Sequence, residues 1–345
     1  MREAFTRHAR IPLLDGIRAT TCLMVIASHT NPSCCGWLPG RTALLSFFVM
    51  SGFLITWLLA AEQEERGTIA LGRFYARRAL RIFPPFYIYW LIGLALTLAL
   101  GGVQRWSDAL TSLVYISNYT TARDSFREPF VSHLWSLSVE EQFYLIWPFA
   151  YRWLALRGPR TAARALAVFI VAVWAWRIFA ALHGAPWYYL FGSFETRADQ
   201  FAIGCLLAVL IHGRLAEGWL MRPTAAIASL AGLLAVIVAE YRLPVNFTFI
   251  AGLPLSALLI GFFIAQAVPN AAHPLFHWLE WRPLVALGRI SYSVYLFHVC
   301  CQIAVQRFCA SASTAVRLPL VMALSVGFGV LMHRWVERPI LARRP

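Results

Sequence analysis

Residues 42–61 read TALLSFFVMSGFLITWLLAA, a run of 20 residues without one charged side chain. A helix needs about 20 mostly apolar residues to cross the hydrocarbon core of a bilayer. Similar runs recur along the chain, which is 59% hydrophobic and 13% charged. A soluble domain carries about 25% charged residues, so this chain has too few to cover a surface that faces water. The sequence therefore predicts an all-α, multi-pass membrane protein and excludes a soluble one.

The apolar runs predict ten transmembrane helices in one membrane domain over residues 1–345. We expect spans near 11–30, 42–61, 84–101, 134–151, 165–182, 198–212, 224–240, 248–268, 289–309 and 317–335. The stretch 109–119 is apolar but too short to cross, so we expect it to be interfacial or re-entrant. No cleavable signal peptide is expected, because the first span continues past Asp15 and Arg18 without a small-residue exit.

The charges predict how the chain is oriented in the membrane. All 30 basic residues are arginine, and 20 of them fall in the two terminal segments and in alternate loops. This positive-inside pattern predicts that both termini face the cytoplasm of a bacterial inner membrane. It also accounts for the net charge of +14 without a nucleic acid partner.

Cysteine and histidine spacing predicts no metal site. The seven cysteines are scattered, and His273 and His277 have no third ligand evident in their loop. The adjacent Cys34 and Cys35 fit either two small apolar residues or an external disulfide.

The first span contains polar residues that are costly in lipid. A charge within the bilayer costs about 2.5–3.5 kcal/mol on insertion scales, and those that persist often serve function. Arg18 and His29 are eleven residues apart, close to three helical turns, so they share one face about 16 Å apart. Asp15 is placed to pair with Arg18. His29 is therefore a candidate catalytic base, and the alternative is a buried histidine bonded to a neighbouring helix.

A second polar cluster lies in the tract HLWSLSVEEQ, residues 133–142. Ser136 or Ser138 is placed to cap a helix, in which case Glu140 and Glu141 would favour its positive end. The alternative follows from the topology, which puts Glu140 and His29 in the same outer half of the membrane. A carboxylate there would orient the imidazole and raise its basicity.

The third cluster is basic and precedes the third span. Arg73, Arg78 and Arg81 begin a helix, and guanidinium groups suit phosphate. Anchoring to anionic lipid is the alternative. Two weaker candidates are Asp199, placed to pair with Arg197 at the start of the sixth span, and His298 inside the ninth span, where a core histidine is at least as good a reading as a catalytic one.

Taken together, these segments resemble the acyltransferase family 3 of integral-membrane O-acyltransferases. The matching stretches occur in the family's order over nearly the whole chain: 14–19 with His29, 47–55, 77–82 with Pro84, 133–145, 199–204, 287–298 and 337–339. The resemblance implies a ten-helix protein that uses a cytoplasmic acyl-CoA and acylates a sugar hydroxyl, often on the outer side. Some members carry an extra helix and an extracellular esterase-like domain, and we expect this chain to be of the stand-alone type.

The resemblance also implies roles for individual residues. Arg18 and His29 match the family's Arg-x10-His pair, with His29 the expected catalytic residue. Arg78 and Arg81 match an Arg-x-x-Arg motif implicated in donor binding or site integrity. Glu140 and Glu141 match the carboxylates of the family's 133–145 tract.

The resulting hypothesis is acyl transfer without a permanently bound cofactor. Acyl-CoA, acetyl-CoA by default, would rest its phosphates on Arg73, Arg78 and Arg81, and its pantetheine arm would reach His29. His29 would take the proton of a carbohydrate or glycoconjugate hydroxyl, oriented by Glu140 or Glu141. The further supporting residues are Asp15, Ser138, Asp199 and His298.

Other readings stay open at this point. A covalent acyl-histidine would replace the general base. A transporter or flippase of a glycolipid or acyl group would bury charge without chemistry, and a membrane scaffold would need no aligned Arg18–His29 face. The acceptor, the acyl group, the side of the membrane on which transfer occurs and the oligomeric state are left open by the sequence.

Overall fold

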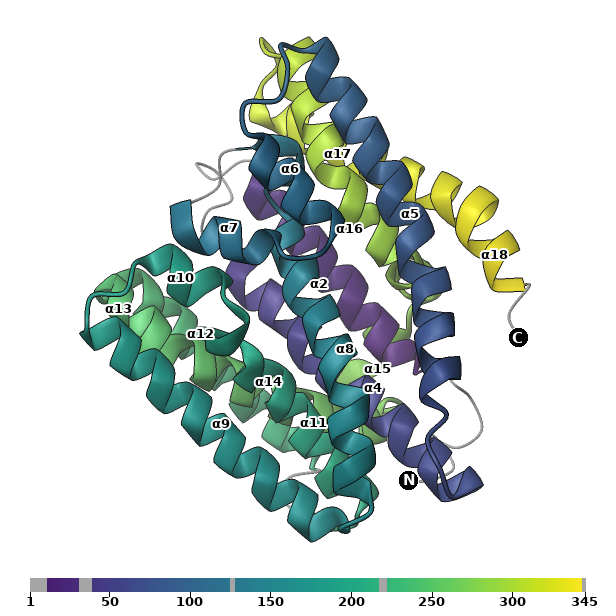
Figure 1. Ribbon diagram of the computed structural model, residues 1–345, viewed down its shortest axis with the longest axis vertical. Coiled ribbons are helices and arrows are strands. Elements are labelled where there is room, and N and C mark those ends of the chain that lie inside the picture. The colour runs from purple at the N-terminus through teal and green to yellow at the C-terminus, as the bar shows by residue number, and fades with distance from the viewer. Residues whose placement is uncertain (1–10, 31–38, 125–127, 217–221, 343–345) are drawn as a thin grey trace.

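The computed structural model describes residues 11–30, 39–124, 128–216 and 222–342. Among these residues there are helices and connecting segments but no β-strand, which confirms the predicted all-α fold (Figure 1). Cys34, Cys35 and the arginines before residue 11 lie outside the described residues.

Each of the ten predicted spans overlaps a helical segment. These segments are α2 (Pro12–Thr30), α4 (Gly40–Arg66), α5 (Leu71–Ala99), α8 (Leu134–Ala155), α9 (Pro159–Leu182), α11 (Ala198–His212), α12 (Pro223–Arg242), Val245–Asn270, α16 (Arg282–Phe308) and Thr314–Ala342. Within the described chain, seven are long and apolar enough to cross a membrane: α4, α5, α9, α12, Val245–Asn270, α16 and Thr314–Ala342. The other three are α2, α8 and the shorter α11. The count of ten and the direction of the termini therefore stay predictions.

Two of these segments are composite. Val245–Asn270 joins α13 (Val245–Phe247), the π-helical turn η4 (Thr248–Gly252), α14 (Leu253–Ala267) and the 3-10 turn η5 (Val268–Asn270). Thr314–Ala342 joins α17 (Thr314–Met332), the π-helical turn η7 (His333–Glu337) and α18 (Arg338–Ala342).

Short helices make the remaining connections. They are α6 (Trp106–Leu113), α7 (Ser117–Asp124), η1 (Pro129–Val131), α10 (Trp187–Gly192), η2 (Phe194–Thr196), α15 (Pro274–His277) and η6 (Trp278–Glu280). The stretch 109–119, expected to be too short to cross, is divided between α6 and α7 by a turn at Tyr115, whose φ is 56°.

One boundary differs clearly from the sequence prediction. The spans on either side were expected at 42–61 and 84–101, but α4 continues to Arg66 and α5 already begins at Leu71. Pro84 and Pro85 lie inside α5 rather than at its start. Membrane helices tolerate proline because neighbouring groups satisfy the freed backbone, so the arginines before the prolines belong to the same helix as the span.

The centre of the bundle is built on α2 and α4 (Figure 1). Helix α4 packs against α11 and α14 on one side and against α2 on the other, and α2 in turn packs against α16. The contact between α4 and α11 is very close, because a Cβ added at Gly52 would lie 2.0 Å from the carbonyl oxygen of Phe201, and one at Gly204 would lie 2.0 Å from that of Val49. Small residues at a crossing let membrane helices approach to this distance.

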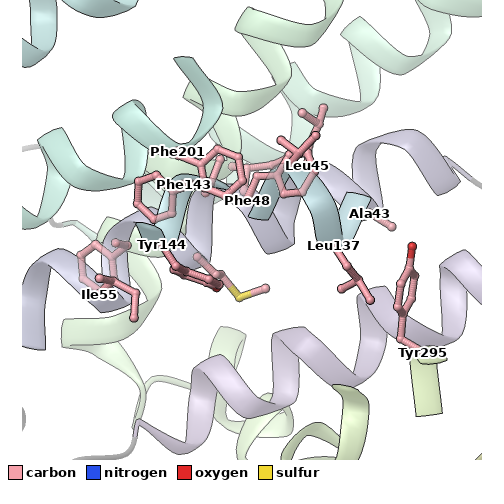
Figure 2. Close-up of a cluster of buried hydrophobic side chains, with 14 of the residues drawn as sticks. Ala43, Leu45, Phe48, Ile55, Leu137, Phe143, Tyr144, Phe201 and Tyr295 are labelled. Carbon is pink, nitrogen blue, oxygen red and sulfur yellow. The ribbon is translucent and has the colours of Figure 1, made fainter. Parts of the chain in front are cut away.

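Aromatic rings fill the space beside that crossing. The ring of Phe201 on α11 stacks on Phe48 of α4 at 4.6 Å between centroids and on Phe143 of α8 at 4.5 Å. Figure 2 shows this cluster, with Tyr144 and Leu137 on the adjoining part of α8. Apolar packing therefore fixes α8 against α4 and α11.

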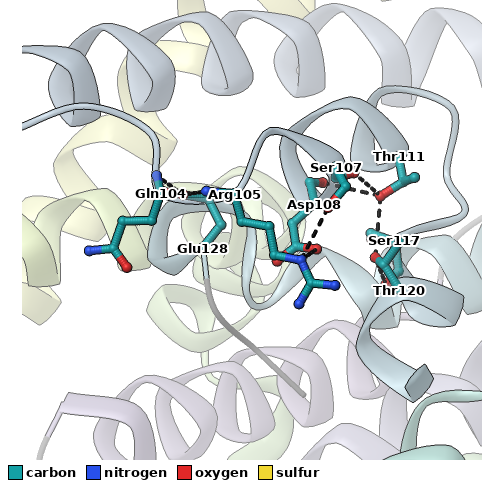
Figure 3. Close-up of polar contacts among 8 residues, drawn as sticks. All are labelled: Gln104, Arg105, Ser107, Asp108, Thr111, Ser117, Thr120 and Glu128. Atoms are coloured by element: carbon teal, nitrogen blue, oxygen red, sulfur yellow. Dashed lines mark hydrogen bonds and ion pairs between the residues drawn. The ribbon is translucent and has the colours of Figure 1, made fainter. Parts of the chain in front are cut away.

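A polar network holds the segment that leads into α8. The buried carboxylate of Glu128 accepts hydrogen bonds from the backbone N–H groups of Gln104 (2.9 Å) and Arg105 (3.1 Å). The Arg105 side chain also pairs with Asp108 at 3.3 Å, as Figure 3 shows. Because Glu128 stands just before η1 and His133, this network fixes where α8 begins.

Candidate active site

His29 lies at the end of α2, where it is exposed and meets a second histidine. Its Nδ1 is 2.9 Å from Nε2 of His298, which is fully buried near the middle of α16. The two rings are stacked, with centroids 5.2 Å apart. The side-chain amide of Gln302 donates to the carbonyl of His29 at 2.9 Å. These two hydrogen bonds join residues that are far apart in the sequence, by 269 and 273 positions. They hold the end of α2 against α16.

A third histidine completes this group and was not among the predicted site residues. His133 precedes α8, is 3% exposed, and its ring lies edge-on to that of His298 at 5.1 Å between centroids. Its Nε2 donates to the carbonyl of Leu296 at 3.1 Å, while its Nδ1 has no hydrogen-bond partner in the described part of the chain. The sequence signal was its position at the head of the tract 133–142.

The partners of Glu140 and Glu141 differ from the expectation. Arg78 of α5 lies 3.8 Å from Glu140 and 4.0 Å from Glu141. Glu140 also accepts hydrogen bonds from the hydroxyls of Ser51 and Tyr144. Among the described residues, neither carboxylate contacts His29. Glu140 is seven residues after His133, which places it about 10 Å further along α8.

The capping explanation for this tract is wrong. Helix α8 already begins at Leu134, without a side-chain cap, so Ser136 and Ser138 lie inside it. Each hydroxyl donates to a carbonyl one turn earlier, and Ser138 also bonds to the Ser117 hydroxyl of α7 at 2.9 Å. Glu140 and Glu141 are therefore too far along the helix to meet its free N–H groups.

Arg78 and Arg81 of α5 lie at the opposite end of α2, near Arg18. Arg78 stacks on the Tyr144 ring, with Cζ 3.3 Å from the centroid. Arg81 is exposed and interacts electrostatically with Arg18, Arg78 and Glu337. Arg81 and the exposed Arg73 make no hydrogen bond or ion pair with any described residue. Two guanidinium groups thus remain open to an anion.

Acidic residues surround this cluster. Asp15 pairs with Arg18 at 3.6 Å, as expected, and also with Arg289 of α16 at 3.9 Å. Glu337, a buried residue that was not among the predicted site residues, accepts from the Ser293 hydroxyl and lies 3.1 Å from His333. The sequence signal for Glu337 was its place in the matching stretch 337–339.

Asp199 is paired with a different arginine from the one expected. Its two oxygens accept from Arg177 of α9 at 2.9 Å and 2.7 Å, and both side chains are fully buried. Arg197 instead donates through Nε to the carbonyl of Phe191 and lies over the Phe191 ring. Arg177 also donates to the carbonyls of Phe249 and Thr196. Asp199 therefore joins α11 to α9, and in the described part of the chain it makes no hydrogen bond or ion pair with the three histidines.

The two ends of α2 thus differ in chemistry. One end carries guanidinium groups that suit phosphate, and the other carries an imidazole held by a second imidazole. The intervening helix from Arg18 to His29 is continuous and about 16 Å long. A model of the acyltransferase 3 family, described as an acyltransferase domain, matches residues 11–334. The chain belongs to this family.

Curated relatives of this chain carry O-acetyltransferase names. It is 30% identical over 321 residues to peptidoglycan O-acetyltransferase OatA of Listeria monocytogenes, which covers 85% of this chain and 50% of the relative. It is 28% identical over 351 residues to O-acetyltransferase OatA of Staphylococcus aureus, which covers 96% of this chain and 57% of the relative. The chain thus spans about half the length of these relatives. No solved structure matches it.

Proposed function

We propose that this acyltransferase is a membrane O-acetyltransferase that moves an acetyl group from acetyl-CoA to a hydroxyl of a carbohydrate or glycoconjugate. Two relatives named O-acetyltransferases, one of them for peptidoglycan, support this choice of acyl group and acceptor class. The observation that carries the proposal is the arrangement on α2, with Arg18 beside open guanidinium groups and His29 held at the other end.

The donor phosphates would bind where guanidinium groups lack protein partners. We assign this role first to Arg81, which lies near Arg18, and to the exposed Arg73, because Arg78 is already engaged by Glu140, Glu141 and Tyr144. Arg78 would then fix the shape of the donor site. The pantetheine arm would extend along α2 and bring the thioester to His29.

His29 would act as a general base. Its imidazole takes the proton of the acceptor hydroxyl as that oxygen attacks the thioester carbonyl. The C–S bond then breaks, the new ester forms, and the proton on His29 passes to the departing CoA thiolate. Asp15 would hold Arg18, and Ser138 and Asp199 would hold α8 and α11 in place.

The test uses the purified full chain in detergent, with acetyl-CoA and soluble peptidoglycan fragments. We expect CoA release and O-acetylated fragments with the wild type, and a loss of at least about 100-fold in His29→Ala, because a general base contributes typically 10²–10⁴-fold. His183→Ala is the matched control, since His183 is an exposed histidine that directly follows the end of α9, and it should keep full activity.

Two results would contradict the proposal. If monodisperse His29→Ala keeps substantial activity per folded molecule, His29 is not the base. If the wild type binds acetyl-CoA but leaves the thioester intact with every glycan offered, the chain moves a group or lipid without chemistry.

A further inference from the structure

His29 belongs to a chain of hydrogen bonds that ends on a backbone carbonyl. His298 Nδ1 is within hydrogen-bond distance of the Tyr295 carbonyl on the same helix, and its Nε2 faces Nδ1 of His29 at 2.9 Å. His298 is fully buried, whereas His29 is exposed. The inner ring is therefore sealed, and only the outer ring is open to substrate.

The carbonyl determines where each proton lies. A carbonyl oxygen can only accept, so Nδ1 of His298 carries a proton and donates it to Tyr295. A neutral imidazole has one N–H, which leaves Nε2 of His298 as an acceptor. Nδ1 of His29, facing that acceptor, must then be the donor. The lone pair of neutral His29 is left on its Nε2.

We propose that His298 is a positioning residue that fixes His29 as its Nδ1–H tautomer, so that Nε2 of His29 is the atom that takes the proton of the acceptor hydroxyl. This inference rests on the proposed function. It adds the identity of the reactive nitrogen and of the residue that selects it. In histidines generally, the hydrogen bond made by one ring nitrogen sets whether the other is protonated.

The groups around the pair are suited to this role. Among the described residues, no carboxylate contacts either ring. The rings packed on His298 are His133 and Tyr295, and His133 donates from Nε2 to a carbonyl of its own. The backbone carbonyl of Tyr295 on α16 thus decides which nitrogen of each ring carries the proton, since a buried unpaired N–H would be costly.

Three substitutions at position 298 separate positioning from packing. His298→Gln can present its amide oxygen where Nε2 of the imidazole lay, whereas His298→Asn is too short to reach His29. His298→Phe keeps a ring of similar shape without an acceptor. We expect His298→Gln to stay within about threefold of the wild-type kcat, and His298→Asn and His298→Phe to lose about 100-fold, the lower end of a general-base contribution. The KM for acetyl-CoA should be unchanged in all three.

A measurement on the wild type does not depend on any variant folding. In protein labelled with ¹³C and ¹⁵N at histidine, the correlation from Cδ2 reports whether Nε2 is protonated. The signal of His29 is the one that disappears in His29→Ala. At a pH where His29 is neutral, we expect a bare Nε2, and a protonated Nε2 would overturn the proposal.

The outcomes also distinguish this proposal from the proposed function. If His29→Ala is inactive while His298→Asn and His298→Phe remain fully active, His29 is the base but His298 does not position it. If His29→Ala keeps its activity, the proposed function itself fails. Loss of kcat in Asn and Phe variants with rescue by Gln, together with the bare Nε2, supports the positioning role.

Discussion

Arg78 and Arg81 lie one helical turn apart on α5, yet their surroundings differ. Arg78 is held by two carboxylates and a tyrosine ring. Arg81 is exposed beside the like charges of Arg18 and Arg78 and has Glu337 in electrostatic range. Two residues of one sequence motif can therefore carry separate tasks, one structural and one in binding.

Arg81→Ala should weaken use of the donor without unfolding the protein. Loss of a charge-assisted hydrogen bond to phosphate costs about 1.5–3 kcal/mol, so we expect the KM for acetyl-CoA to rise at least about tenfold. Arg81→Lys should restore only part of the loss, because the planar fork is absent. An unchanged donor KM in Arg81→Ala, measured on monodisperse protein, would favour anchoring to anionic lipid instead.

Arg78→Ala should act on stability first. It leaves Glu140 and Glu141 without their cation, and removing one partner of a buried pair costs about 3–5 kcal/mol. Both carboxylates are partly exposed, 19% and 17%, so we expect the lower end of that range. Thermal unfolding in detergent, compared with Arg81→Ala, measures the difference. Equal stability of the two variants would show that the carboxylates find other partners.

Asp199→Ala should be among the single substitutions that lower the stability of the protein most. Arg177 and Asp199 are both fully buried and share two hydrogen bonds, so the change strands a guanidinium group in the bundle, at about 3–5 kcal/mol. Replacing both residues, as in Arg177→Met with Asp199→Leu, should recover much of the loss because neither charge of the pair is then left without its partner. A double variant no more stable than Asp199→Ala would contradict this reading.

At the scale of elements, the crossing of α4 and α11 depends on two glycines. The added Cβ at Gly52 or Gly204 would meet a backbone carbonyl at 2.0 Å, and a backbone atom cannot turn aside as a flexible side chain can. The aromatic rings around Phe201 are fitted to this close approach. Separation of the two helices would therefore also loosen α8 (Figure 2).

Gly52→Ala should lower the midpoint of thermal unfolding, because overpacking costs typically 1–3 kcal/mol and the obstacle here is backbone. Gly327→Ala is the matched control, as it also lies within a helix, α17, but its added Cβ meets nothing within 4 Å. It should leave stability unchanged or raise it, since alanine favours helix over glycine. Similar midpoints for both variants would mean that α4 and α11 can move apart at little cost.

The positions of most helices could be predicted from the sequence, but most contacts between side chains on different helices could not. The apolar runs predict α11 at its observed bounds and α2 within one residue. They do so because a chain in lipid must pair all its backbone polar groups internally, and a helix is one of the few structures that does this. The shared face of Arg18 and His29 could also be predicted, since both residues lie on one helix. The contacts of His298, Arg78 and Asp199 join helices far apart in sequence, and periodicity within a helix carries no information about which neighbour it meets.

At the scale of the whole molecule, the arginine distribution predicts that both termini face the cytoplasm. A reporter fused to the C-terminus and one inserted in the segment 102–133 should therefore report opposite sides of the membrane. An insertion near Thr111 would disturb the network of Figure 3, so the turn at Gly101 and Gly102, where Gly101 is exposed, is the better site. The same side for both reporters would break the ten-span topology.

The continuity of α2 has a mechanical consequence. An α-helix is stiff along its axis, with a fixed rise of about 1.5 Å per residue, and Arg18 and His29 are both part of it. When neighbouring helices tilt or slide, the width of any passage beside α2 changes, but the distance between these two residues does not. If the proposed donor is held by its phosphates near Arg18, its reactive carbon must therefore lie at one set distance from them to meet His29, whatever the positions of the neighbouring helices.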